Sequence, residues 1–517
     1  MKGTDFILGV DAGSSVIKAV AFDLQGNEAF VHERPSRLKR LHPLWMEQDM
    51  EEMWGEVKKC VARVARAVRQ QHGNLIAIGV SSTGDGTWMM DARGRPVRNG
   101  ILWCDGRAAA IVDQWHAGRL ARKAFAICGT SVFTGSQAVQ LAWLRQHEPS
   151  ALKKASVIFH AKDWLFYKLT GNITTDETDA SLTMLRMSTR QYDAKLFKIL
   201  KVDDLFDKFP PVRASQENTG ALLPVVAKEL GLLPGLPVGS GPMDVSACAL
   251  GSGAIESGEA SSILGTAAIH QLIMDKPILK PDMVGMTLCH GVKERWIRLI
   301  AAMTATPNLD WFLSEMGRDM AGGERPGSGR FYRRLEDILR KVPPGSDGVL
   351  YHPYLFPGGE RGPFVKPTAR ASFTGLTLNH GRRHLLRAVY EGVAFSMLDC
   401  YRHMPIEPKS IYLSGGGTNS GFWCQLIADC LGKRVRVPAG SQFGAKGAAI
   451  NIGIAIGVYA DAKDAVRQTV RWARHYEPDR KNTAIYNDLY TVYKATYESQ
   501  MANWDLRAQI KPEVKHE

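Results

Sequence analysis

The sequence predicts an α/β protein in which helices pack against the faces of sheets. Segments with the alternating pattern of strands recur between segments with helical spacing along the whole chain of 517 residues. Several of the expected strands end in short polar turns rich in glycine and serine. With 45% hydrophobic and 23% charged residues, the chain can bury full-sized cores, and its length suggests about three domains or two large ones.

The N-terminal segment shows this alternation most clearly. Phe6–Asp23 reads as two strands joined by the turn Asp11–Ser15, because apolar residues alternate on both sides of that turn. Asp49–Arg69 has apolar residues at helical spacing and begins with a capping-box pattern. Leu75–Ser82 is the next expected strand, and it ends in the polar loop Thr83–Trp88. Loops at strand ends commonly hold ligands.

The same order of elements returns later in the chain. Val238–Asp244 and Ser261–Ile269 are expected strand-and-turn segments, and Ile411–Leu413 leads into three glycines and a helix at Ser420–Leu431. The tripeptide Ile7-Leu8-Gly9 recurs as Ile263-Leu264-Gly265, which suggests two similar halves. The small residues of 251–258 mark a boundary, so we expect domains at 1–255 and 256–517.

Composition excludes several classes of protein. No stretch of about 18 uncharged apolar residues is present, and the N-terminus lacks the apolar core of a signal peptide, so we expect a cytoplasmic protein without a membrane partner. The eight cysteines form no CxxC pair, which indicates neither a zinc site nor a disulfide framework. The formal charge is +13, but basic residues are mixed with acids throughout. We expect no nucleic-acid partner.

Three turns have the chemistry of phosphate binding. In Asp11–Ser15, backbone N–H groups and hydroxyls can hold phosphate oxygens while Asp11 holds Mg²⁺ through water. Gly265–Ala267 is a second such turn. Gly415–Gly417 precedes a helix, so backbone can approach a flat or anionic ligand closely. Each turn read alone can also be an ordinary hairpin or loop.

Carboxylates near aromatic residues form the second group of candidates. Asp244 follows a turn shaped by glycine and proline in apolar sequence, so it either performs chemistry or caps the helix expected at 245–250. Asp85, Asp105 and Arg107 lie near tryptophans. Acids beside aromatic side chains suit hydroxyl-rich ligands, although solvated loop charges would give the same pattern. The tryptophans are Trp88 and Trp103.

Taken together, these segments resemble the FGGY family of carbohydrate kinases over essentially the whole chain. Their number and order carry the resemblance more than any single motif does. The matching segments are Ile7–Ser15, Ile78–Asp91, Leu102–Arg107, Lys162–Gly171, Gly241–Asp244, Gly265-Thr266, Phe356–Pro363, Ala371–Glu391 and Ser414–Gly432.

The resemblance implies two actin-like domains with ribonuclease-H-like sheets that flank an ATP cleft, and it implies ATP and Mg²⁺ as cofactors. Asp244 takes the family's catalytic position, where it accepts the proton of the attacking hydroxyl, and Asp11 takes the metal position. The implied substrate residues are Gly84, Asp85, Trp88, Trp103, Asp105, Arg107 and Asp244. The implied ATP-binding residues are Gly13, Ser14, Ser15, Lys18, Gly265, Thr266, Asn308, Gly415, Gly416, Gly417 and Asn419.

The substrate loop departs from better-known members of the family. Glycerol kinases carry arginine and glutamate, and xylulose kinases methionine and histidine, where this chain has Gly84-Asp85. Val245 stands where an amide is frequent and Gln140 where a lysine is common. The loop looks most like that of erythritol kinases, with L-xylulose or other pentulose kinases as the alternative. We therefore expect a small polyol or sugar as the partner, and the sequence leaves a homodimer open.

Two readings from other classes stay open at this point. A non-metabolic actin-like ATPase or scaffold would share the phosphate turns but would have no use for Asp244 as a hydroxyl-orienting carboxylate. A polyanion-binding protein driven by the positive charge would bind nucleic acid in a strongly salt-dependent way. The acids at Asp85 and Asp244 favour the kinase.

Overall fold

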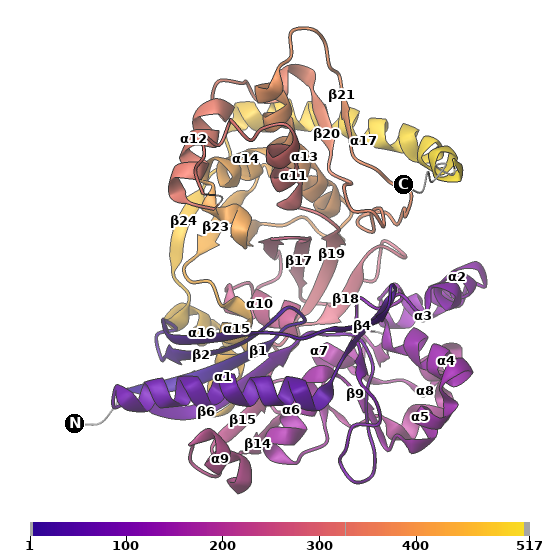
Figure 1. Cartoon of the computed structure of the whole chain (residues 1–517), viewed down its shortest axis with the longest axis vertical. Coiled ribbons are helices and arrows are strands. Elements are labelled where there is room, and N and C mark those ends of the chain that lie inside the picture. The colour runs from indigo at the N-terminus through magenta and orange to yellow at the C-terminus, as the bar shows by residue number, and fades with distance from the viewer. Residues whose placement is uncertain (1–3, 183, 326, 511–517) are drawn as a thin grey trace, which may run out of the picture. The chain divides into compact units, whose positions relative to one another are not determined.

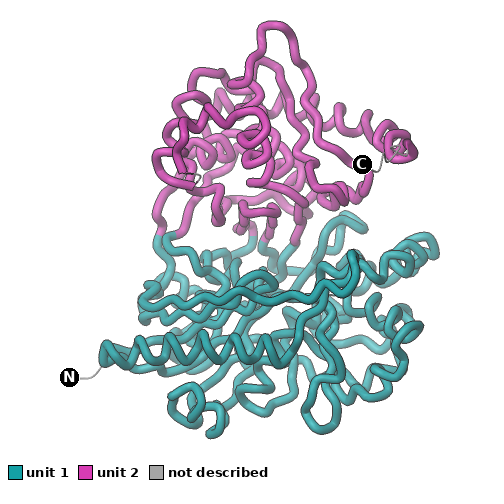
Figure 2. Tube along the Cα trace, viewed as in Figure 1, with its two compact units in different colours: residues 1–257, 273–298, 439–471 teal, residues 258–272, 299–438, 472–517 magenta. Residues whose placement is uncertain are grey.

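The structure is a computed structural model that describes residues 4–182, 184–325 and 327–510. Its chain divides into two compact units (Figure 2). Unit 1 comprises residues 1–257, 273–298 and 439–471, and unit 2 comprises residues 258–272, 299–438 and 472–517. The chain first passes from unit 1 to unit 2 after Ser257, close to the expected boundary, and it then returns to unit 1 twice.

Unit 1 is built on a six-stranded sheet in the order β14-β15-β6-β1-β2-β3. The first two strands and the turn between them form as the alternation predicts, and β1 also pairs in parallel with β6. β15 continues the parallel part of the sheet beside β6, and β14 closes it in the antiparallel direction. The strands are β1 (Asp5–Ala12), β2 (Val16–Asp23), β3 (Glu28–Pro35), β6 (Asn74–Ser82), β14 (Thr219–Ala221) and β15 (Pro237–Ser240).

Helices cover both faces of this sheet (Figure 1). α1 (Met50–Gln70) packs against β2 and β3, and its N-terminus is capped by Asp49, as predicted, because that carboxylate accepts bonds from two backbone N–H groups. α15 (Phe443–Ala455) packs against β1 and β6. A Cβ atom at Gly79 would lie 2.1 Å from the carbonyl oxygen of Ala448, so this helix approaches the sheet more closely than any side chain allows.

The remaining elements of unit 1 flank this sheet or form a second apolar cluster around α2 to α5. The other helices are α2 (Ala109–Ala117), α3 (Leu120–Cys128), α4 (Gln137–His147), α5 (Pro149–Lys154), α6 (Ala161–Thr170), α7 (Glu177–Ala180), α8 (Ala194–Ile199), η1 (Asp203–Lys208), α9 (Pro224–Leu230), α10 (Asp244–Gly251) and α16 (Ala462–Thr469). The short strands are β4 (Lys39–His42), β5 (Trp45–Gln48), β7 (Trp88–Met90), β8 (Gly100–Ile101), β9 (Val157–Phe159), β10 (Thr175–Asp176), β11 (Leu185–Arg186), β12 (Gln191–Tyr192) and β13 (Val212–Arg213).

A second sheet has the order β18-β19-β17-β16-β22-β23-β24, and its strands β16, β22, β23 and β24 belong to unit 2, whereas β18 belongs to unit 1. β16 pairs antiparallel with β17 and parallel with β22, β23 continues the parallel part, and β24 is antiparallel. This is the same succession of directions as in β2-β1-β6-β15-β14. The strands are β16 (Glu259–Leu264), β17 (Ala268–Met274), β18 (Met286–Cys289), β19 (Trp296–Ala302), β22 (Ser410–Ser414), β23 (Arg434–Pro438) and β24 (Trp472–Tyr476).

The two halves are therefore similar in topology, although the repeated tripeptide is not equivalent in them. Ile7-Leu8-Gly9 lies in the middle of β1, whereas Ile263-Leu264 ends β16.

In unit 2 the helix α13 (Arg382–Arg402) packs against α11, α12 and α14, and most of its side chains are buried. The bounds of the remaining elements are α11 (Pro307–Glu315), α12 (Gly329–Leu339), η2 (Ser346–Gly348), β20 (Leu350–His352), β21 (Ser372–Thr374), η3 (Gly416–Asn419), α14 (Gly421–Leu431) and α17 (Arg480–Gln509).

Within the described ranges, none of the helices combines the length and hydropathy that crossing a bilayer requires. All eight cysteines are free thiols, and Cys104 is the exposed one.

Candidate functional site

The carboxyl ends of three neighbouring strands of unit 1 bring together the acids that the sequence singled out. Asp11 lies near the end of β1, where it is the register partner of Lys18 on β2 and of Ser81 on β6. Asp244 is the first residue of α10, directly after β15 and its connecting turn. Because β1, β6 and β15 run in the same direction, their following loops meet at one edge of the sheet.

The charge of Asp11 acts on Asp244. Burial raises the pKa of Asp244 to about 7, and the negative charge of Asp11 acts in the same direction. Burial also raises the pKa of Asp11 to about 6, while Lys18 opposes that shift. Asp244 Oδ1 accepts a bond of 2.7 Å from Val245 N, so its side chain does bond to the first turn of α10. Among the described residues, no cation forms an ion pair with either carboxylate.

The substrate loop predicted at 83–88 lies beside Asp244. A Cβ atom at Gly84 would lie 2.6 Å from Met243 Sδ, and the Gly84 backbone N–H lowers the pKa of Asp244, which offsets a small part of the burial effect. Asp85 has a φ of 57° and Gly86 a φ of 81°, so the chain turns through left-handed backbone at this point. The side chain of Asp85 is nearly buried, at 7% exposure. Against the effect of burial, the charge of Asp85 helps to raise the pKa of His160, so the loop places this carboxylate near the buried residues of α6.

The tryptophans and the Asp105–Arg107 segment occupy different environments. Trp88 lies wholly in the core, where its ring packs under Gly100, whereas Trp103 is half-buried. Arg107 donates to Asp105 at 2.8 and 2.9 Å and to Glu47 at 2.8 Å. Its guanidinium also lies over the rings of Trp45 and Trp143. Asp105 and Arg107 therefore bind each other and brace the loop that carries Trp103.

The turn after β1 is closed by a backbone hydrogen bond of its own. Gly13 N donates to Val16 O at 3.1 Å, which closes the turn, and the residues from Gly13 to Ser15 are half-buried or exposed. Lys18 Nζ donates to Gln442 Oε1 at 3.0 Å. A Cβ atom at Gly444 would lie 2.5 Å from Asp11 Oδ2, so the first turn of α15 closes one side of the acid.

The sequence did not indicate Gln442 and Gly444 as site residues. They are distant in sequence from Asp11 and Lys18, since the chain passes through unit 2 before it returns to unit 1 at residue 439. The carboxylate oxygens of the half-buried Asp11 fit a hard divalent cation such as Mg²⁺, since a carboxylate with a raised pKa becomes more stable when a cation approaches.

The predicted nucleotide residues of unit 2 gather at the ends of β16 and β22. The turn Gly265-Thr266 is anchored to the start of α11, since the N–H groups of Thr306 and Ala305 donate to the carbonyl oxygens of Gly265 and Thr266 at 3.0 and 2.9 Å. Thr266 itself is exposed. The anchoring leaves the outer side of this turn open for a ligand.

The three glycines after β22 have different roles. A Cβ atom at Gly415 would lie 2.6 Å from Leu264 O, and one at Gly417 would lie 2.3 Å from a Leu264 methyl group, so both positions need glycine for packing. A Cβ at Gly416 would meet nothing within 4 Å. Gly416 and Asn419 are exposed, and Asn419 bonds to Tyr332. Backbone at Gly416 is therefore free to approach a ligand.

Asn308 differs from the other predicted nucleotide residues. It is wholly buried, its Nδ2 donates to Ala305 O at 3.1 Å, and its Oδ1 accepts from Tyr351 OH at 2.8 Å. The amide is thus engaged within the fold, where it holds the start of α11. The pattern of apolar residues in the sequence could not predict that Asn308 binds Tyr351, because the two residues are distant in sequence.

A buried polar cluster adjoins the Asp244 loop, and sequence reasoning found only part of it. Lys162 Nζ lies 3.0 to 3.3 Å from carboxylate oxygens of Asp163, Asp176 and Asp179, and all four side chains are almost completely buried. His160, Asp163 and Asp179 also lie close enough together to bind a metal ion. The Lys162 ammonium already supplies the positive charge among these acids, which disfavours a cation there.

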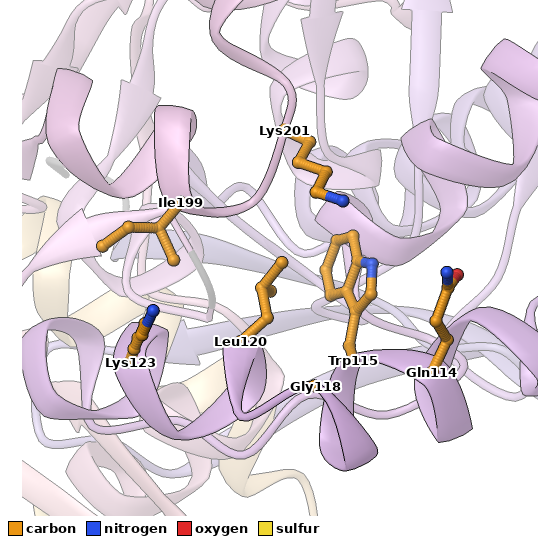
Figure 3. Close-up of a pocket in the computed structure, with 7 residues that line it drawn as sticks. All are labelled: Gln114, Trp115, Gly118, Leu120, Lys123, Ile199 and Lys201. Carbon is orange, nitrogen blue, oxygen red and sulfur yellow. The ribbon is translucent and has the colours of Figure 1, made fainter.

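A pocket of about 340 Å³ lies elsewhere in unit 1, between α2, α3 and α8 (Figure 3). None of the predicted site residues lines it, and its lining contains no carboxylate. We therefore do not assign the reaction to this pocket. Its lining residues are Gln114, Trp115, Gly118, Leu120, Lys123, Ile199 and Lys201.

Comparison with known proteins finds a family match in both parts of the chain. The N-terminal domain model of the FGGY family of carbohydrate kinases matches residues 6–251, and the C-terminal domain model matches residues 260–456. Erythritol kinase of Brucella abortus is 32% identical over 98% of both chains, and xylulose kinase of Escherichia coli is 29% identical over 95% of this chain and 98% of its own.

Among solved structures, xylulose kinase from Rhodospirillum rubrum superposes with a TM-score of 0.87 at 25% identity, over 97% of this chain and 100% of that one. The expected architecture of two actin-like domains is thereby confirmed. An enzyme rather than a scaffold follows from the match of both domain models. The chain belongs to the FGGY family of carbohydrate kinases.

Proposed function

We propose that this chain transfers the γ-phosphoryl group of ATP to a hydroxyl of a small polyol, with erythritol as the first candidate. One observation carries the proposal: a Cβ atom at Gly84 would lie 2.6 Å from Met243 Sδ, so the substrate loop with Asp85 packs against the residue directly before the predicted catalytic acid. The similarity to an erythritol kinase along nearly the whole chain supports the same choice.

The carboxylates favour a polyol over a ketose for a simple chemical reason. An ionised carboxylate only accepts hydrogen bonds, and each carbon of a polyol carries a hydroxyl that can donate one. A ketose has a carbonyl oxygen that cannot donate. We assign Asp85 to hydroxyls distant from the reacting one, and we assign the half-buried Trp103, rather than the core residue Trp88, to the carbon face. L-Xylulose or another pentulose is the alternative substrate.

In the proposed reaction the substrate hydroxyl attacks the γ-phosphorus of ATP. A bond forms between that oxygen and phosphorus, the bond from phosphorus to the bridging β,γ-oxygen breaks, and ADP leaves with that oxygen. Asp244 orients the hydroxyl and takes its proton as the new bond forms. Mg²⁺, held through Asp11, would neutralise charge on the phosphates. Lys18 and the turn of Gly13, Ser14 and Ser15 would bind phosphate oxygens.

We propose that residues 1–255 supply the substrate side and the catalytic acid, whereas residues 256–517 bind adenosine and phosphate. In the second segment, exposed Thr266, Gly416 and Asn419 are the groups best placed to contact the nucleotide. We assign supporting roles to three predicted residues: Asp105 and Arg107 support the Trp103 loop, and Asn308 supports α11.

The test is ADP release with MgATP on a panel of erythritol, L-xylulose, D-xylulose, D-ribulose, glycerol and L-ribulose. Erythritol should give the highest kcat/KM, and a pentulose in first place would select the alternative. The Asp244→Asn variant should lose on the order of 10² or more of kcat and keep its ATP affinity. Near-normal turnover by that variant would contradict the role given to Asp244.

A further inference from the structure

The turn that carries Asp244 is held by hydrogen bonds from buried side chains on both sides. Thr178 Oγ1, on the short helix α7, accepts a bond of 2.9 Å from Met243 N, the residue directly before Asp244. Ser81 Oγ, at the end of β6, donates to Pro242 O at 2.7 Å. The hydroxyls of Thr178 and Ser81 thus hold Met243 and Pro242, two successive residues of the turn.

The hydroxyl of Thr178 is itself fixed by a charge. Its Oγ1 donates to the Asp176 carboxylate at 2.9 Å, so its lone pairs point toward the Met243 N–H. Asp176 is paired with Lys162 at 3.0 Å, and Lys162 Nζ also donates to Ser240 Oγ at 3.1 Å, at the end of β15. The network therefore contacts the segment 240–243 at its first residue and at its last.

We propose that Thr178, with Asp176 and Lys162 behind it and Ser81 on the other side, is a positioning residue for Asp244. The inference rests on the proposed role of Asp244 as the acid that takes the hydroxyl proton. Thr178 touches neither reactant in this scheme. It fixes the backbone from which Asp244 projects, and a displacement of about 1 Å in such a group can cost on the order of 10² in rate.

Burial makes the arrangement rigid, and the charges of Asp176 and Lys162 are paired with each other. Thr178, Asp176, Lys162, Ser240 and Ser81 are all wholly buried. A bond to an ionised group is stronger than a neutral one, and leaving the Met243 N–H without an acceptor in this environment would carry a desolvation penalty. The peptide group between Pro242 and Met243 is therefore confined to one orientation.

The experiment compares three threonine variants. Thr178→Val keeps the shape of the side chain but removes the acceptor, and Thr178→Ser restores it. Thr175→Val is the matched control, because Thr175 is equally buried and its hydroxyl has no hydrogen-bond partner in the described structure. Each is assayed for kcat and sugar KM with the fastest sugar of the panel, for ATP affinity and binding stoichiometry by calorimetry, and for Tm.

Thr178→Val should lower kcat by about 10- to 100-fold. ATP affinity and sugar KM should stay within about threefold of wild type, and Thr178→Ser should recover most of the rate. Thr175→Val should behave as wild type. A merely structural role would lower Tm and the fraction of protein that binds ATP while leaving kcat per binding site unchanged.

Three results would overturn the inference: kcat of Thr178→Val within about twofold of wild type, an equal loss in Thr178→Ser, or an equal loss in Thr175→Val. If Thr178→Val does not fold, Ser81→Ala carries the test, and its kcat should fall at least about fivefold with ATP binding retained. Turnover that survives Asp244→Asn would instead refute the proposed function. A dead Asp244→Asn with a normal Thr178→Val would refute only the positioning role.

Discussion

Asp244 should destabilise the folded protein at neutral and alkaline pH. Its pKa is about 7 in the fold and 3.8 as the ordinary value, because burial and the charge of Asp11 disfavour the ionised form. The unfolded chain therefore releases this proton more readily than the folded one does. The resulting cost is absent below pH 3.8, grows as pH rises, and is complete above about pH 7.

The size of the effect follows from the two pKa values. At about 1.36 kcal/mol per pKa unit, the full cost is at most about 4 kcal/mol, and partial exposure of Asp244 to solvent reduces it to roughly 1–3 kcal/mol. An asparagine in place of Asp244 cannot ionise, yet its side-chain oxygen can still accept from Val245 N. The Asp244→Asn variant should therefore be more stable than wild type at pH 8, and by a smaller margin at pH 5.

The assay is thermal unfolding of both proteins at pH 5 and pH 8, with EDTA and without nucleotide, so that no cation neutralises Asp11 or Asp244. Each kcal/mol corresponds to about 2–4 °C in Tm for a domain of this size. Asp49→Asn is the control with the opposite expected change in Tm. Lys39 and backbone N–H groups lower the pKa of Asp49, so this variant should be less stable than wild type. Equal Tm differences at both pH values, or a less stable Asp244→Asn at pH 8, would refute the reasoning.

Three more outcomes separate binding from folding. Asp85→Ala should lower kcat/KM for the polyol by about 1–3 kcal/mol of lost hydrogen bonding, measured in steady-state assays with ATP saturating; an unchanged substrate profile would remove Asp85 from the site. Arg107→Met should cost about 3–5 kcal/mol of stability, measured in urea, because Asp105 is left buried and unpaired. A loss below about 1 kcal/mol would show that solvent reaches the pair. Gly416→Ala should raise the KM for ATP at unchanged Tm, whereas Gly417→Ala should lower Tm by overlap with Leu264; the reverse pattern would contradict the packing argument.

The parts of the site that follow from local pattern could be predicted from the sequence. Alternating apolar residues define β1 and β6 and so place Asp11 and the loop of Asp85 at strand ends. The cap at Asp49 and the glycine turns are equally local signals. Whether a carboxylate such as Asp244 serves chemistry or a helix cap is not a local property, and the structure shows that its side chain also bonds within α10.

Contacts between distant segments could not be predicted in this way. The bond from Met243 N to Thr178 joins residues 65 apart in sequence, and Lys18 meets Gln442 across 424 residues. Nothing in the apolar period of its strand shows that the ring of Trp88 is buried while that of Trp103 is only half-buried. Each of these facts depends on how elements pack, which periodicity does not encode.

Register shows how two similar sheets acquired different chemistry. The last antiparallel pair is Ala12 with Ile17 in unit 1 and Leu264 with Ala268 in unit 2. One pair earlier, unit 1 has Asp11 opposite Lys18, whereas unit 2 has Ile263 opposite Ile269.

The parallel partner at that position is a serine in both sheets, Ser81 in one and Ser414 in the other. The equivalent place is thus charged in unit 1, where the proposed proton and metal chemistry needs acids. It is apolar in unit 2, which suits a base and sugar held by backbone and glycine. The same backbone topology therefore supports both halves of the proposed reaction, and a few side chains at one edge of each sheet distinguish them.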